Sequence, residues 1–96
     1  MADAIRVVRV RVRGRVQGVG YRAWTADAAR EFGLKGWVRN RADGSVEALF
    51  VGAPDRVAAM LECCKAGPRA ARVTAVEIEE EGGAAPDGGF GIRPTV

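Results

Sequence analysis

Histidine is missing altogether from the 96-residue sequence. This absence excludes histidine nucleophiles and general bases, and it excludes most catalytic zinc sites, which need imidazole ligands. No cluster of carboxylates shows an obvious metal-ligand spacing either. We therefore expect neither a metal nor another cofactor, so any chemistry must depend on arginine, lysine, asparagine, backbone amides and water.

Cysteine is scarce, and the two cysteines, Cys63 and Cys64, are adjacent. Adjacent cysteines rarely satisfy disulfide geometry, and reduced thiols suit the cytosol. Cys63 and Arg69 match the Cys-x5-Arg spacing of cysteine phosphatases, but that loop precedes a helix, whereas here it follows one. The negative end of a helix dipole disfavours a thiolate. We therefore interpret both cysteines as helix residues, with Cys64 on the apolar stripe.

Long apolar runs are absent, and no segment is long enough to span a bilayer. Residues 1–4 lead directly into the first predicted strand, so we predict no signal peptide and a cytoplasmic location. The length predicts a single domain, residues 1–96, and a hydrophobic content of 48% suffices for one core. The net charge of +3 permits anionic ligands without demonstrating nucleic-acid binding.

The apolar residues recur with periods typical of both strands and helices. Strands are predicted at 5–13, 34–41, 45–51 and 72–80, with a short closing strand at 90–93 and helices at 21–31 and 54–65. Asp43-Gly44 predicts a hairpin between the second and third strands. This β-α-β-β-α-β order, with a terminal strand added, predicts an α+β, ferredoxin-like split βαβ sandwich: an antiparallel sheet with both helices on one face.

The same periods predict which side chains are buried. Valines at even positions of the first strand should point inward, and Arg9, Arg11 and Arg13 should form a solvated sheet face. One stripe of the first helix should be apolar: Tyr21, Trp24, Ala28 and Phe32. In the second helix the stripe is Val57, Met60, Leu61 and Cys64. In strand 72–80 the inward candidates are Val73, Ala75 or Val76, and Ile78. Trp37 is interpreted as a packing residue or a semi-exposed sheet residue rather than a substrate contact.

The segment Gly14–Arg22 connects the first strand to the first helix and contains three glycines in seven residues. Glycines allow backbone N–H groups to turn inward together, and the helix start adds partial positive charge, so both features suit a phosphate. Arg22 would lie in the first helical turn, where the helix dipole disfavours a cation. An anion held between the loop amides and the guanidinium would resolve that conflict.

Two segments carry a resemblance to a known family. The segment Gly14–Arg22 resembles the first signature of the acylphosphatases. Their second signature is a Gly-aromatic-Val-x-Asn strand followed by spaced Gly, Val and Gly residues. Here it reads Gly36-Trp37-Val38-Arg39-Asn40, then Gly44, Val46 and Gly52. The resemblance covers nearly the whole chain, and 81–89 is its least family-like part.

The resemblance implies an enzyme that hydrolyses the carboxyl-phosphate anhydride of acyl phosphates to a carboxylate and inorganic phosphate. The family's catalytic arginine corresponds to Arg22 and its catalytic asparagine to Asn40. Its phosphate-binding backbone amides correspond to Arg15, Val16, Gln17, Gly18, Val19, Gly20 and Tyr21. The expected partner is a small-molecule acyl phosphate, whose place inorganic phosphate or another small anion can take. We expect a monomer that binds neither nucleic acid nor membranes.

Three other interpretations fit less well. The segment 18–23 matches a dinucleotide-binding glycine pattern, but the preceding strand alternates valine with arginine, whereas a Rossmann first strand is buried on both faces. An RNA-recognition motif shares the element order, but segment 45–51 has one aromatic residue and its Glu47 would repel phosphates. A domain of the same fold with little turnover, acting as a carrier or regulatory piece, is the third.

Overall fold

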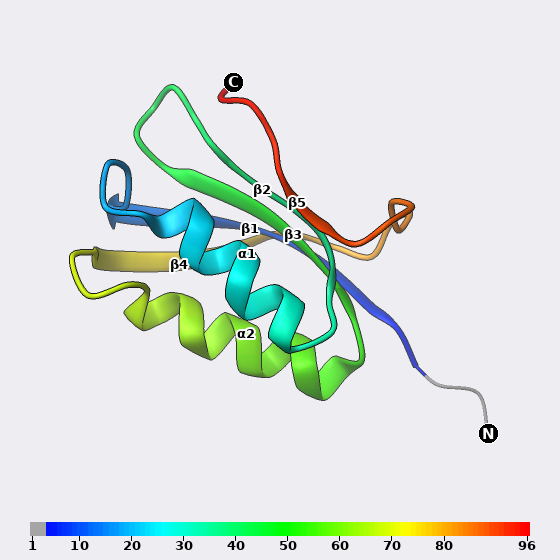
Figure 1. Cartoon of the computed structure of the whole chain (residues 1–96). Helices are drawn as coiled ribbons and strands as arrows, with labels where there is room; N and C mark the ends of the chain where they lie inside the picture. The colour runs from blue at the N-terminus through cyan, green and yellow to red at the C-terminus, as the bar shows by residue number, and fades with distance from the viewer. Residues whose placement is uncertain (1–3) are drawn as a thin grey trace.

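The computed structural model describes residues 4–96, in which two helices cover one face of a five-stranded sheet (Figure 1). The elements are β1 (Arg6–Arg15), α1 (Tyr21–Glu31), β2 (Lys35–Asn40), β3 (Val46–Gly52), α2 (Pro54–Ala66), β4 (Arg72–Glu81) and β5 (Phe90–Ile92). Residues 1–3, part of the segment in which we predict no signal peptide, lie outside the described residues. No helix within residues 4–96 is long and apolar enough to cross a membrane.

The strand order in the sheet is β4-β1-β3-β2-β5. The pairs β1–β3, β1–β4 and β2–β3 are antiparallel, as predicted, whereas β5 pairs in parallel with β2 and makes the sheet mixed. The ferredoxin-like α+β prediction is confirmed. The glycine-rich loop before α1 and the hairpin between β2 and β3 lie at the same end of the sheet (Figure 1).

The core lies between the sheet and the two helices. Val8, Val10 and Val12 of β1 are at most 1% exposed, which confirms the alternation predicted from the sequence. In α2, Val57, Met60 and Cys64 are fully buried and Leu61 is partly buried, so the predicted stripe is confirmed. Burial raises the pKa of the Cys64 thiol to about 12, which leaves it protonated and unsuited to nucleophilic attack.

The buried face of α1 differs from the predicted stripe. Its fully buried side chains are Tyr21, Thr25, Ala26 and Ala29, whereas Trp24, Ala28 and Phe32 are only partly buried. The predicted stripe does pack against the core, but the most deeply buried face of α1 is turned from it toward Thr25 and Ala29. The small residues Thr25 and Ala29 let the helix approach the sheet closely, and the bulky Trp24 lies at the margin, where its ring contacts Tyr21 at a centroid distance of 5.3 Å.

Strand β4 is irregular in two places. Its register against β1 shifts between Arg13 and Gly14 and again between Arg9 and Val10, so that one residue of β4 is left unpaired at each point. The first shift puts Val73 and Val76, three residues apart, against the core, and so settles the predicted choice between Ala75 and Val76. Ile78 shares their face but stays 48% exposed, because β4 is an edge strand.

Gly36 in β2 gives a stability prediction. Its φ is +132°, and a Cβ added there would overlap with the carbonyl oxygen of Leu49 on β3. Gly36→Ala should therefore lower the free energy of unfolding by about 2 kcal/mol or more, measured by urea denaturation. Gly91→Ala on the neighbouring strand is the control, because a Cβ there would meet nothing within 4 Å. Equal stabilities of the two variants would contradict this explanation.

Candidate active site

The loop between β1 and α1 leaves a row of backbone donors without acceptors. Gly18 and Gly20 have left-handed φ values of 73° and 79°, which bend the chain tightly. Within residues 4–96, no backbone N–H from Val16 to Ala23 donates a hydrogen bond to the protein. Unpaired backbone donors are rare in folded proteins unless water or a ligand satisfies them, so this row is suited to an anion.

The N-terminus of α1 is part of the same row. Gly20 is its N-cap residue, no side chain caps it, and its first turn carries no acidic residue. Its partial positive charge is therefore not neutralised within the helix. Tyr21 fixes the position of this helix end, because its buried hydroxyl donates to the carbonyl oxygen of Cys64 in α2 at 2.7 Å. Burial raises the pKa of Tyr21 well above its ordinary value, so the hydroxyl stays a donor.

A cleft of about 280 Å³ lies beside these donors. Its lining residues are Val16, Gln17, Gly18, Gly20, Tyr21, Arg22, Ala23, Asn40 and Ile92. Arg22, in the first turn of α1, takes part in no ion pair or side-chain hydrogen bond within residues 4–96. Among the described residues that line the cleft, Arg22 is thus the one with a charged side chain, and that charge has no partner among residues 4–96.

Asn40, the last residue of β2, belongs to the same cleft. Alternation along β2 puts Asn40 on the same face as the fully buried Val38, and this face is turned toward α1. Its side-chain oxygen is buried and has no hydrogen-bond partner within residues 4–96. A buried polar atom without a partner is costly, so a water or substrate atom in the cleft would stabilise it.

Most of the predicted site residues come together in this way. Arg22, Asn40 and the loop residues 16–18, 20 and 21 line one cleft. Arg15 is instead the last residue of β1, and Val19 packs against the core, so neither lines the cleft. The sequence did not single out Ala23 and Ile92, because a small or apolar residue carries no chemical signature of its own.

The Gln17 side chain connects the glycine-rich loop to the β2–β3 hairpin, a role that the sequence did not reveal. Its Nε2 donates to the carbonyl oxygens of Arg41 and Ser45, each at 2.8 Å. These two residues flank the turn of the β2–β3 hairpin, and Arg41 directly follows Asn40. Gln17 therefore ties the glycine-rich loop to the strand end that carries Asn40, and it sets the spacing between the two halves of the cleft.

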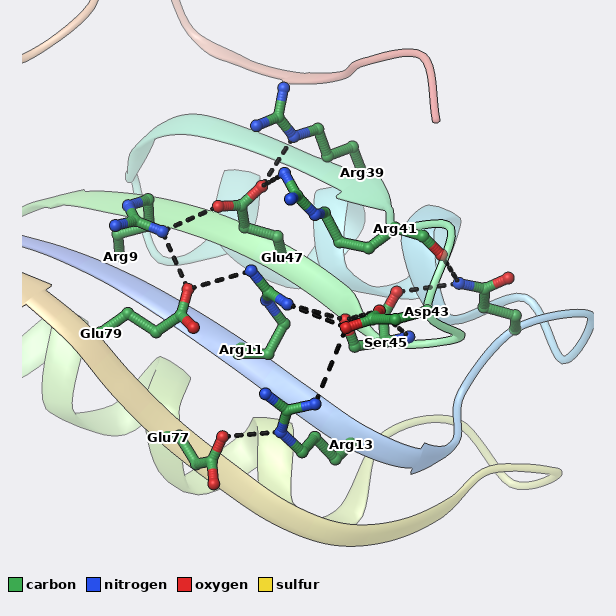
Figure 2. A network of polar contacts seen from close by, with 11 residues as sticks. Arg9, Arg11, Arg13, Arg39, Arg41, Asp43, Ser45, Glu47, Glu77 and Glu79 are labelled. Atoms are coloured by element: carbon green, nitrogen blue, oxygen red, sulfur yellow. Dashed lines mark hydrogen bonds and ion pairs between the residues drawn. The ribbon is translucent and has the colours of Figure 1, made fainter. Parts of the chain in front are cut away.

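The face of the sheet away from the helices carries a network of ion pairs (Figure 2). Arg9 pairs with Glu47 and Glu79 at 2.9 and 2.8 Å, and Arg11 pairs with Glu79 at 3.2 Å. The prediction of a solvated arginine face is therefore wrong for Arg11, whose side chain is only 11% exposed, whereas the Arg13 side chain is 44% exposed. The partners come from β3, β4 and the hairpin, which the sequence of β1 cannot show.

Glu47 is the central residue of this network. Its carboxylate, 3% exposed, accepts from Arg39 at 2.7 Å and from Arg41 at 3.2 Å, and these arginines flank Asn40. Burial alone would raise the pKa of Glu47, but hydrogen bonds from Arg39 and Arg9 outweigh it and hold the pKa below its ordinary value. Glu47 thus braces the end of β2 from the side opposite the cleft.

This brace gives a pH prediction. Because the pKa of Glu47 is lower in the folded state, its contribution is present above the unfolded-state pKa, about 4.3, and is lost as the pH falls further. Glu47→Gln should lower the free energy of unfolding at pH 7 by about 1–3 kcal/mol. The difference from wild type should shrink below about pH 4 in urea denaturations at stepped pH. A difference that is constant down to pH 3 would contradict the ionised brace.

The same face bears on the RNA-binding alternative. On this face β1 carries Arg9 and Arg11 and β3 carries Glu47, whereas an RNA-recognition motif needs stacking aromatics on its sheet. The guanidinium groups of Arg39 and Arg93 lie over the Trp37 ring at 4.7 and 4.9 Å, and at 8% exposure Trp37 is a packing residue rather than a semi-exposed one. Within residues 4–96, no three His, Cys, Asp or Glu residues form a group that could hold a metal ion.

Comparisons with known proteins agree with this geometry. A family model described as Acylphosphatase matches residues 8–92. The chain is 58% identical over 76 residues to an acylphosphatase of Bradyrhizobium diazoefficiens, and the match covers 79% of this chain and 77% of the relative. It is 50% identical over 93 residues to an acylphosphatase of Rhodospirillum rubrum, and that match covers 96% of this chain and 100% of the relative. The structure of an acylphosphatase from Coxiella burnetii matches with a TM-score of 0.88 at 34% identity, covering 93% of both chains. The chain therefore belongs to the acylphosphatase family and is an acylphosphatase.

Proposed function

We propose that this acylphosphatase hydrolyses acyl phosphates by direct in-line attack of water on the phosphorus atom. The row of unpartnered amides from Val16 to Ala23, beside the unpaired guanidinium of Arg22, is the observation that carries the proposal. Phosphoryl transfer needs positioning and charge stabilisation more than covalent help from the protein. Preorganised donors around the phosphoryl oxygens supply both.

In the proposed reaction, the water oxygen forms a bond to phosphorus while the bond from phosphorus to the bridging oxygen breaks. The carboxylate leaves with the bonding electron pair, and the water contributes a hydroxyl group to the inorganic phosphate and releases a proton. A carboxylate is a good leaving group and needs no general acid. A loose transition state also makes little demand on a general base, which suits a chain without histidine.

Asn40 has the complementary role of orienting the attacking water. Its unpartnered side-chain oxygen can accept a hydrogen bond from that water, while the amide nitrogen can donate to it or to a phosphoryl oxygen. Gln17 and Glu47 act through position: Gln17 holds the hairpin to the loop, and Glu47 holds the arginines that flank Asn40. Neither side chain has to touch the phosphoryl group for this mechanism to operate, whereas the backbone N–H of Gln17 belongs to the row of amides that binds it.

Hydrolysis of benzoyl phosphate with and without a chelator tests the proposal. We expect the same rate in both conditions, because Arg22 and the loop amides stabilise the charge in place of a metal. A rate that disappears with chelator and returns with a divalent cation would contradict the metal-free mechanism. The proposed monomer and the proposed lack of nucleic-acid binding can be checked on the same sample by light scattering and by an RNA titration at low salt.

A further inference from the structure

Ile92 lies on an edge strand of the sheet and lines the cleft. It is the last residue of β5 and lies opposite Val38 in a parallel register, so both side chains are on the helix face of the sheet. Val38 is completely buried there, whereas Ile92 is 49% exposed and lines the cleft. Ile78 on the other edge strand is equally exposed, so what distinguishes Ile92 is that it lines the cleft and gives it an apolar surface beside the polar loop.

The course of β5 fixes this surface in place. Arg30, near the end of α1, donates to the carbonyl oxygen of Phe90 at 3.0 Å, and the ring of Phe90 stacks on Phe50 at 5.7 Å. The start of β5 is thus attached to the last turn of α1. Because β5 is parallel to β2, it then runs toward the end of the sheet where Asn40 and the first turn of α1 lie. Ile92 is therefore placed beside the glycine-rich loop by a strand whose start is attached to α1 and to the core.

The remaining lining residues leave little polar capacity for the rest of a substrate. Arg22 and the loop amides are assigned to the phosphoryl group, and the Gln17 amide is committed to two carbonyl oxygens. What remains exposed at the rim is apolar: Ile92 on β5 and Ala23 on α1. Among residues 4–96, no carboxylate lines the cleft, and no cation other than Arg22 does.

We propose that Ile92 packs against the acyl group of the substrate, so that the cleft prefers acyl phosphates with an aryl or branched alkyl tail over acetyl phosphate. This inference rests on the proposed function, because it takes the phosphoryl group to lie against the loop amides. The acyl carbon is joined to that group through one bridging oxygen, so the tail must begin at the rim. We expect the affinity for the larger tail to be about fivefold higher. This is less than the discrimination that one methylene gives in an enclosed pocket, because Ile92 covers only one side of the tail.

Two non-hydrolysable phosphonates test the inference by binding alone. Phenacylphosphonate carries a phenyl tail and acetonylphosphonate a methyl tail, and in both a methylene replaces the bridging oxygen. Calorimetric titration of wild type should give a Kd about fivefold lower for the phenyl compound. Ile92→Ala should reduce that ratio to below about twofold while leaving acetonylphosphonate binding nearly unchanged. Ile78→Ala is the matched control, because Ile78 is 48% exposed on the opposite edge strand.

The outcomes separate this inference from the proposed function. A ratio that Ile92→Ala leaves unchanged, a wild type without preference, or no binding of either phosphonate would overturn the role of Ile92. Hydrolysis of benzoyl and acetyl phosphates is measured on the same variants. Hydrolysis with an unchanged binding ratio keeps the proposed function and rejects this inference. An Ile92-dependent ratio without hydrolysis rejects the proposed function and keeps the apolar subsite.

Discussion

Arg22→Ala should lower kcat for benzoyl phosphate by about 10²–10³, the scale for removing one preorganised donor from a transition state. The guanidinium lies in the first turn of α1, lines the cleft and has no carboxylate partner within residues 4–96. Its loss should therefore cause no structural rearrangement through a broken ion pair. Because negative charge on the phosphoryl oxygens is present in both ground and transition states, KM should rise as well.

Two further variants identify what Arg22 contributes. Arg56→Ala removes the same charge from an exposed position in the first turn of α2 and should leave kcat within about twofold, because exposed positions without contacts contribute little. Arg22→Lys keeps the charge but loses the planar pair of donors, so it should recover only part of the rate. Activity of Arg22→Ala equal to that of Arg56→Ala would remove Arg22 from the mechanism.

Asn40→Ala should lower kcat by about 10² with little change in KM. The asparagine oxygen is buried beside the cleft without a partner, which is the condition expected of a group whose partner is the attacking water. Positioning of water matters chiefly in the transition state, so ground-state binding should survive its removal. Steady-state kinetics with benzoyl phosphate, supported by a phosphate titration for binding, separate the two effects.

Asn40→Asp sharpens this test, because it keeps the shape of the side chain and adds a negative charge beside the phosphoryl group. It should weaken phosphate binding as well as kcat, whereas Asn40→Ala should affect kcat almost alone. Equal losses of kcat and of phosphate affinity in Asn40→Ala would point to a substrate-binding or structural role in place of water orientation. Circular dichroism of both variants checks that the β2–β3 hairpin still folds.

The order of the elements and most of the core followed from the sequence. Alternation in β1, the stripe of α2 and the Asp43-Gly44 turn are local patterns, and each gave the observed structure. The predicted stripe of α1 packs against the core only in part, because the face of α1 that is most deeply buried also includes Thr25 and Ala29. Packing against the sheet selected the face with the smaller residues, Thr25 and Ala29, over the face with Trp24.

Local sequence patterns could not predict the arginine network, because its ion-pair partners are distant in the sequence. Arg13 pairs with Glu77, 64 residues away, and Arg9 with Glu79, 70 residues away. The register shift opposite Arg9 and Val10 adds one residue to β4, and this lets Glu79 and Glu80 both reach the guanidinium of Arg9. No periodicity in β4 alone indicates a bulge.

The residues of the candidate site likewise include some that local sequence motifs identify and others that depend on distant neighbours. Arg22 and Asn40 carry recognisable functional groups next to glycines and turns, so sequence motifs were enough to select them. The tether from Gln17 to the hairpin and the apolar rim at Ile92 depend on which backbone carbonyls and which strand edge lie nearby. Those neighbours are set by the tertiary fold.

The central claim is that the backbone amides from Val16 to Ala23, together with Arg22, hold the phosphoryl group. Titration of the ¹⁵N-labelled protein with inorganic phosphate, followed by two-dimensional ¹H–¹⁵N NMR, tests it most directly. We predict that the largest amide shift changes cluster at residues 16–23 and that Arg22→Ala greatly weakens them. Shift changes centred elsewhere, for example on the arginine network around Glu47, or unaltered by Arg22→Ala, would contradict the claim.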